Sequence, residues 1–399
     1  MNSVLRFVFF SFIAVLASAQ ELSHSVPDPQ RQNALQLEEQ GNTAAAEAAW
    51  SEVSKSHPAN PEPYAHLALL KARQEEYKDA IPLYRKALAL DANRPAVRLN
   101  LGLALFKAGQ LKDAIREFRI LRKQAPENSP EAQRLDVLLG LSHYGLAEYP
   151  CAVPYLKAAA SRDRQNSPLL LSLAHSCLWS KQYQCVVETY HQILSLNAES
   201  ADADMLAGEA LDELRDSDGA IKMFRAAVAA DPKEPDVHFG LGYLLWTQKQ
   251  YPEAVTQFQA ELENDPNHAQ ALVYLGDSYL QLANSAEARV PLAKGLALDR
   301  SLWLGDLDLG IIDSEAGRND DALRELRTAA KLKPDEVSVH WHLARHLRKL
   351  GRKDEAKVEF DTAQKLNKAA DEDLYKKIAN NGEKRRKDQV SQTAALPIQ

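Results

Sequence analysis

Apolar positions recur along the chain with a period of about thirty-four residues, and each copy places small and large side chains at the same offsets. Within a copy these positions fall three or four residues apart, the spacing of one face of an α-helix. Two such stripes, separated by a short polar break, predict a pair of helices. The predicted helix pairs cover residues 27–60, 61–94, 95–128, 133–166, 167–200, 201–234, 235–268, 269–302, 303–336 and 337–370, with one insertion at 129–132.

Small residues mark the places where two helices must approach closely. The eighth position of every copy is Gly or Ala, and the twentieth is Ala in all copies but one, where Val186 stands. The twenty-fourth position is bulky, for example Phe224 or Phe258. Because the twentieth and twenty-fourth positions lie one turn apart, each second helix presents a small residue beside a large one.

Glycine and proline mark the ends of the predicted helices. Gly109 stands at the fifteenth offset of its copy, in a polar break where a left-handed residue ends the first helix. Proline disfavours helical geometry in the residue before it and lacks an amide hydrogen. The pairs Asp231-Pro232, Asp265-Pro266 and Lys333-Pro334 are therefore expected to end second helices.

This pattern resembles the tetratricopeptide repeat, whose signature is W-x2-L-G-x2-Y, then A-x3-F, then P. The copy at 235–268 carries it as Leu241-Gly242, Leu245, Ala254, Phe258 and Pro266. Two residues depart from it, namely Asn33, and Glu261 at a usually small offset. The resemblance implies an all-α fold, a right-handed α-solenoid superhelix of helix-turn-helix hairpins.

The resemblance also implies where a partner binds, because first helices line the concave face of this family. The expected peptide-binding side chains are Phe106, Tyr144, Trp179, Glu209, Asp212, Phe239, Tyr243, Trp246, Trp341, Arg345 and Arg348. They predict a groove with aromatic floors, one acidic patch and one basic end, suited to peptide segments of other proteins. The competing interpretation is that several of them pack between neighbouring hairpins. The early copies carry Ala65, Leu69, Leu99 and Leu103, which argues against a clamp for a chaperone's C-terminal carboxylate.

Composition narrows the class of function further. The chain has a net charge of −7 and lacks a basic stripe, which argues against a nucleic-acid partner. It contains no phosphate-binding glycine loop and no hydrolase or zinc-protease motif, so we expect neither an enzyme nor a cofactor. His342 and His346 lie four residues apart, yet no further ligand accompanies them, and no metal site is expected. An aromatic floor also suits sugars or acyl chains, so an accessory subunit that binds glycan or lipid is the alternative function.

The two ends of the chain carry signals of their own. Residues 1–19 read as a signal peptide, with Arg6, an apolar run and Ala17-Ser18-Ala19 before the expected cleavage site. The apolar run is too short to span a bilayer comfortably, so no integral membrane span is expected. A linker at 20–26 follows, and after the repeats a capping helix at 371–380 and a disordered tail at 381–399 are predicted. The protein is thus expected to be exported to the periplasm or the extracellular space.

Three cysteines lie close together in the repeat pattern: Cys151, Cys177 and Cys185. In an exported chain a disulfide can form, and the two helices of one hairpin can bring Cys177 near Cys185. Cys177 could instead pair with Cys151, and an odd count leaves one thiol free.

Overall fold

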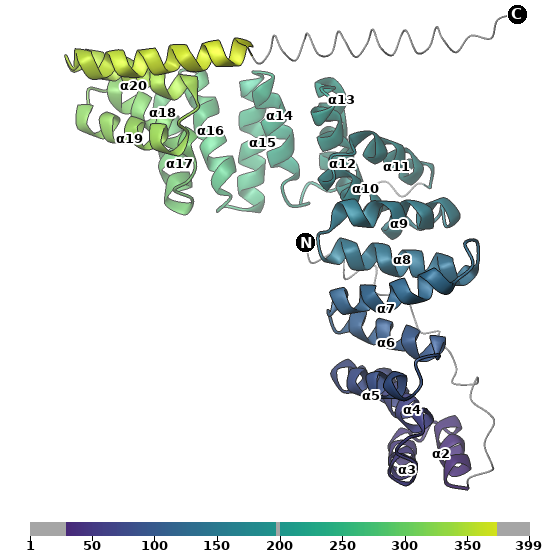
Figure 1. The fold of residues 1–399 in the computed structure, drawn as a ribbon. Coiled ribbons are helices and arrows are strands. Elements are labelled where there is room, and N and C mark those ends of the chain that lie inside the picture. The colour runs from purple at the N-terminus through teal and green to yellow at the C-terminus, as the bar shows by residue number, and fades with distance from the viewer. Residues whose placement is uncertain (1–28, 197–199, 373–399) are drawn as a thin grey trace, which may run out of the picture. The chain divides into compact units, whose positions relative to one another are not determined.

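Residues 29–196 and 200–372 are described by a computed structural model (Figure 1). Within these residues every regular element is an α-helix and no strand occurs, so the predicted all-α class is confirmed. Residues 1–19 and 381–399, for which a signal peptide and a tail are expected, lie outside the described residues, as does most of the predicted capping helix.

The chain divides into two compact units, Met1–Met223 and Phe224–Gln399, with the division inside α13 (Ser217–Ala230). The helices of the first unit before α13 are α2 (Pro29–Glu39), α3 (Thr43–Ser56), α4 (Pro61–Arg73), α5 (Tyr77–Leu90), α6 (Pro95–Lys107), α7 (Leu111–Gln124), α8 (Pro130–Gly145), α9 (Tyr149–Arg162), α10 (Ser167–Trp179), α11 (Tyr183–Ser195) and α12 (Ala201–Glu213). Those of the second unit after α13 are α14 (Val237–Thr247), α15 (Tyr251–Asn264), α16 (Ala269–Gln281), α17 (Ser285–Leu298), α18 (Trp303–Glu315), α19 (Asn319–Leu332) and α20 (Val337–Lys349). A last helix runs from residue 353 to residue 372, where the description ends.

Consecutive helices form hairpins because glycine or alanine stands where their backbones meet. A Cβ atom at Gly242 of α14 would lie 2.7 Å from Cε1 of Phe258 on α15, and Phe258 and Ala254 are fully buried. The same clash would occur between Gly102 and Phe118 and between Gly310 and Leu326. These contacts confirm that the eighth offset is a point of close helix approach.

The turn inside each hairpin depends on one left-handed residue. At the fifteenth offset Gly109, Gly317 and Gly351 have φ angles of 75°, 76° and 76°. Other hairpins place an ordinary residue there with the same sign of φ, such as Lys249 at 58° and Ala147 at 57°. The turn geometry is therefore a property of the repeat, and glycine fulfils it at the lowest conformational cost.

Helix boundaries follow the proline signals and the insertion. The second helices α13, α15 and α19 each end directly before the Asp-Pro or Lys-Pro pair predicted to stop them. The insertion at 129–132 lengthens the first helix of its hairpin, because α8 begins at Pro130 and has 16 residues. Ser129 caps this helix by accepting a hydrogen bond from the amide of Ala132.

Packing in each unit is between near neighbours along the chain. From α2 to α12 and from α14 to α20, each helix contacts the next one along the chain, and first helices of successive hairpins also touch, as α14 touches α16 and α16 touches α18. The buried side chains accordingly form successive clusters, one of them built from α18, α19, α20 and the last helix. A solenoid that grows by one hairpin at a time packs in this way.

Candidate functional site

Half-buried aromatic rings gather on the first helices of the second unit. Phe239, Tyr243 and Trp246 follow one another at spacings of four and three on α14, so their rings share one face of the helix. The ring centroids of Tyr243 and Trp246 are 5.9 Å apart, and Tyr274 of α16 meets Trp246 edge-on at 4.9 Å. We call these four residues the aromatic surface. Tyr274 was not among the predicted binding residues, because its offset is not one of those expected to face a ligand.

A buried polar link holds Trp246 in place. Its indole N–H donates to Asp277 of α16, which also accepts a hydrogen bond of 3.2 Å from Gln281. Asp277 is in turn hydrogen-bonded to Asp308 of α18. Burial raises the pKa of Asp277, and burial followed by the charge of Asp277 raises the pKa of Asp308 well above its usual range. A hydrogen bond between two carboxyls needs a proton on one of them, and the raised pKa of Asp308 favours that side chain as the donor, so the link joins the first helices of three hairpins.

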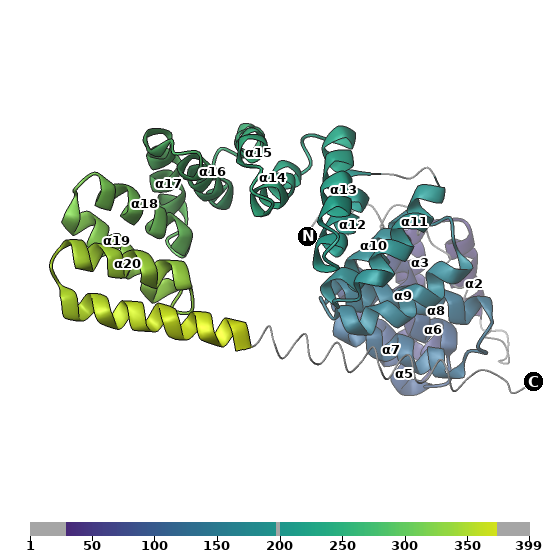
Figure 2. The same cartoon turned by 90° about the horizontal axis from the view of Figure 1, so that it is seen from above.

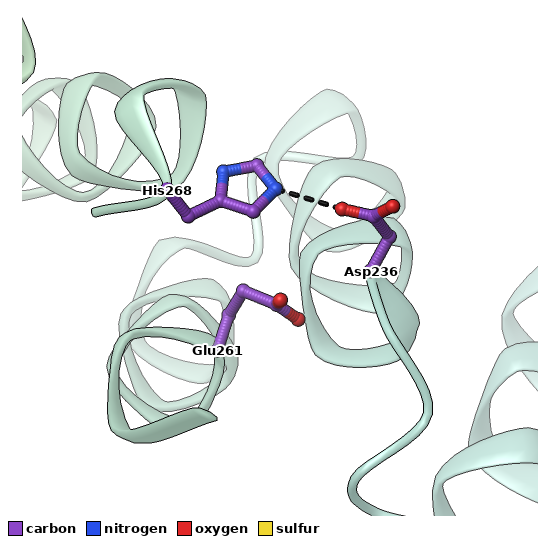
Figure 3. A group of neighbouring side chains, drawn as sticks. All are labelled: Asp236, Glu261 and His268. Atoms are coloured by element: carbon purple, nitrogen blue, oxygen red, sulfur yellow. Dashed lines mark hydrogen bonds and ion pairs between the residues drawn. The ribbon is translucent and has the colours of Figure 1, made fainter. Parts of the chain in front are cut away.

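Asp236, Glu261 and His268 form the one group of potential metal ligands found in the described residues (Figure 3). His268 Nε2 lies 2.8 Å from an Asp236 carboxylate oxygen, and Nδ1 accepts the amide hydrogen of Ala271 at 3.0 Å. A neutral ring that accepts at Nδ1 carries its proton on Nε2 and cannot offer that nitrogen to a metal. Glu261 accepts the amide of Phe239 at 3.0 Å. Glu261 and His268 thus cap the N-termini of α14 and α16, and this role explains why Glu261 departs from the repeat pattern.

In the first unit a second aromatic group brings two predicted residues together. Tyr149, at the start of α9, stacks on Trp179 with 6.1 Å between ring centroids and meets the ring of Tyr144 at 5.9 Å. Trp179 is 65% exposed, the largest exposure among the aromatic side chains of the described residues. Phe106 of α6 is half-buried and packs against a neighbouring core cluster, in line with the competing interpretation that some predicted side chains are packing residues.

The predicted acidic residues lie on α12, also in the first unit. Glu209 is exposed and Asp212 is half-buried. Burial, followed by the charge of Glu213, raises the pKa of Asp212. The two carboxyls are one turn apart and face the same side of α12.

The predicted basic residues lie on α20 at the other end of the second unit. Arg345 stands over the ring of Trp341, with 4.5 Å from the guanidinium carbon to the ring centroid. Arg348 stands over Phe360 of the last helix at 5.4 Å. The neighbouring His346 is bonded through both ring nitrogens, to Ser314 Oγ at 2.7 Å and to the Asn319 carbonyl at 3.0 Å.

A disulfide joins Cys177 of α10 to Cys185 of α11, with an S–S distance of 2.11 Å and a Cα–Cα distance of 5.9 Å. Of the two pairings that the sequence allowed for Cys177, this is the one within a single hairpin. Cys151 is an exposed free thiol. Within residues 29–196 and 200–372, no helix combines the length and apolar character that a membrane crossing requires.

Comparisons with known proteins agree with the repeat architecture. Curated relatives include tetratricopeptide repeat protein 1 of Schizosaccharomyces pombe, 23% identical over 57% of this chain and 23% of its own length. The Hsp70-Hsp90 organizing protein 1 of Glycine max is 21% identical over 67% of this chain and 41% of its own. The cell division cycle protein 27 homolog of Caenorhabditis elegans is 24% identical over 78% and 39%. The chain thus spans between about a quarter and two fifths of the length of these relatives.

Solved structures and a family model complete the comparison. The APC/C hetero-tetramer Cut9-Hcn1 is 14% identical, with a TM-score of 0.43 over 87% of this chain and 88% of that chain. MamA is 21% identical, with a TM-score of 0.36 over 41% and 96%. A model of the tetratricopeptide repeat matches residues 32–95, 187–235, 205–268, 239–301 and 307–370, and a second one matches 71–136. These matches cover more than half of the sequence, and the chain belongs to the tetratricopeptide repeat family.

Proposed function

We propose that this protein is a non-enzymatic scaffold of the cell envelope or the secreted space, and that it binds peptide segments of other proteins along its first helices. The observation that carries this proposal is the aromatic surface, because rigid and partly exposed aromatic side chains are the residues on which binding energy concentrates. The hydrogen bond from Trp246 to buried Asp277 fixes one of these rings before a ligand arrives. A ring that is already ordered loses less conformational entropy on binding.

The mutual packing of the rings favours a peptide over a glycan. Tyr243 and Trp246 stack with an interplanar angle of 22°, and Tyr274 stands edge-on to both, at 84° and 75°. Rings that cover one another's faces leave mainly edges for a ligand, whereas a sugar stacks on an open face. Glycan-array and lipid-overlay measurements with the purified protein separate the alternatives. Binding confined to peptides would contradict the alternative function, an accessory subunit that binds glycan or lipid.

The test begins with peptides selected from a random library on the full chain, whose affinities are then measured by calorimetry. Tyr243→Ala and Trp246→Ala are expected to weaken binding by about tenfold or more each, the usual loss at an interface hot spot. The matched control is Val290→Ala, because Val290 is 73% exposed on α17, the second helix of its hairpin. Selected peptides that bind all three variants with unchanged affinity would show that the aromatic surface is not the binding site.

A further inference from the structure

One face of α20 gathers positive charge around an exposed indole. Trp341, Arg345 and Arg348 follow one another at spacings of four and three, so their side chains lie on one side of the helix, and Lys349 is the next residue along the chain. All four are exposed, Trp341 to 42%. The last helix packs beside α20 and supplies Phe360 (Figure 2). We call Trp341, Arg345 and Arg348 the α20 surface.

Both arginines of the α20 surface rest on aromatic rings instead of carboxylates. A guanidinium that stands over a ring interacts through its flat face and leaves its planar edge of N–H donors available. In the described residues neither Arg345 nor Arg348 forms an ion pair. On two of the helices packed against α20, Asp313 of α18 pairs with Arg289 and Arg318, and Glu359 of the last helix pairs with His340. Glu355 pairs with Arg327 and Arg352.

Lys349 and His342, which lie beside the α20 surface, determine how much further positive charge is present there. Lys349 donates to the Ser314 carbonyl of α18, which holds its ammonium group at the end of that helix. Burial, followed by the charge of Arg345, lowers the pKa of His342 to about 4, so this imidazole is neutral at physiological pH. The exposed positive charge is therefore confined to the two guanidiniums and one ammonium group.

We propose that the α20 surface binds an acidic peptide segment of a partner protein, with side-chain carboxylates held edge-on by Arg345 and Arg348 and aliphatic stems packed on Trp341. A carboxylate accepts two parallel N–H bonds from one guanidinium, and this geometry rewards Asp or Glu. The arginines are one helical turn apart, roughly 5–6 Å between Cβ atoms, and alternate side chains of an extended segment have a similar spacing. This inference rests on the proposed scaffold function and specifies the chemistry of one partner segment.

Two other occupants fit the charges less well. Nucleic acid binding draws its strength from many phosphate contacts, whereas the α20 surface and the adjacent Lys349 together offer three cations on a chain of net charge −7. The chain's own sequence at 384–387 is Lys-Arg-Arg-Lys, which has the same sign of charge as the α20 surface. A carboxylate-bearing segment of another protein is the complementary ligand.

The test uses the full chain and a fluorescent decapeptide in which Asp and Glu alternate with Leu and Ser. Its C-terminus is amidated, so that only side-chain carboxylates are available. The comparison peptide replaces every Asp and Glu by Asn and Gln. We expect anisotropy titrations to show binding of the acidic peptide at least about tenfold tighter, with an affinity that falls as salt rises.

Three charge variants identify the surface. The double substitution Arg345→Gln with Arg348→Gln is expected to weaken acidic-peptide binding by at least about tenfold. Arg345→Lys with Arg348→Lys keeps the charge but loses the planar fork, and it should lose most of the affinity. The control, Lys331→Gln with Lys353→Gln, removes the same charge from exposed positions outside the α20 surface and should change the affinity less than about twofold.

Equal binding of the acidic and neutral peptides, or equal losses in the Gln variant and the control, would overturn the α20 assignment. Stronger displacement by inorganic phosphate or by a short RNA than by excess unlabelled acidic peptide would also overturn it. Peptides that were selected on the full chain and that bind Tyr243→Ala more weakly serve as the reference. If they still bind the Arg345 and Arg348 variants, only this inference fails, whereas failure to select any peptide contradicts the scaffold function itself.

Discussion

Asp308 is a buried carboxyl group, and among the described residues no cation stabilises its ionised form. It is 2% exposed, and within the described part of the chain its Oδ2 atom has no hydrogen-bond partner. Its pKa in the folded protein is raised above the unfolded value by burial, then by Asp277. The folded state therefore binds more protons than the unfolded state, so stability is greatest below the unfolded pKa and falls as pH rises above it.

This fall of stability with rising pH leads to a prediction for Asp308→Asn, whose amide donates to Asp277 at every pH. At pH 8 the variant should be more stable than the parent by about 1–3 kcal/mol, because the parent's carboxyl is ionised in the unfolded state and folding must raise its pKa. At pH 3 the difference should nearly vanish, because the parent side chain is then largely protonated in both states. Urea unfolding at the two pH values measures this, with Asp361→Asn on the exposed side of the last helix as the control. A gain of equal size at both pH values would contradict the protonated pair.

A second prediction at the scale of one side chain concerns the helix cap formed by Glu261. It is 2% exposed and accepts the Phe239 amide in the first turn of α14. Glu261→Ala should destabilise the second unit by about 1–2 kcal/mol, because an amide at the helix start loses its acceptor. Glu261→Gln keeps an acceptor and should lose less, and exposed Glu263→Ala should lose almost nothing. Thermal unfolding compares the three, and a neutral Glu261→Ala would remove the capping role.

At the scale of the helix, Ala254 tests how tightly a hairpin is closed. It is fully buried on α15, one turn from Phe258, which fills the space above Gly242. Ala254→Leu adds volume where none is free and should cost about 1–3 kcal/mol by overpacking. Thr256→Leu, on the exposed side of the same helix, is the matched control. Hydrogen exchange should show lost protection in α14 to α16, whereas a uniform loss across the described hairpins would contradict nearest-neighbour packing.

The elements that could be predicted from sequence are those whose contacts lie within one repeat. The eighth, fifteenth, twentieth and twenty-fourth offsets act inside a single hairpin, so their periodicity indicated the helices, the left-handed turns and the close helix contact. The link from Trp246 to Asp277 and on to Asp308 crosses between hairpins. Its two aspartates stand at offsets where no other copy of the repeat has Asp. Periodicity carries no information about such contacts.

The candidate surfaces show the same division. Phe239, Tyr243 and Trp246 could be predicted because they share a helical face, but Tyr274 comes from the next hairpin and Tyr149 from the start of a second helix. Their side chains reach the group through ring contacts of 4.9 Å and 6.1 Å, which depend on the tilt of one helix against another. Helix tilt is set by the packing of whole side chains, and offsets alone do not specify it.

At the scale of the whole molecule, the compartment decides which partners the surfaces can meet. The predicted signal peptide at 1–19 lies outside the described residues, and export remains a proposal. The disulfide between Cys177 and Cys185 is compatible with it, since such bonds persist in oxidising compartments and are rare where thiols are kept reduced. Export and the disulfide can therefore be tested together, by the N-terminus and the thiol state of the same protein sample.

Protein recovered from fractionated native cells should begin near Gln20, because cleavage is expected after Ala19. Alkylation in denaturant before reduction should label Cys151, the free thiol, and leave Cys177 and Cys185 unlabelled until a reductant is added. N-terminal sequencing and mass spectrometry of the same sample give both results. Recovery of an intact Met1 with all three thiols reactive would contradict export and move the search for partners to a reducing compartment. A cleaved N-terminus with three reactive thiols would leave export standing and contradict the disulfide alone, because the two results are read from different residues.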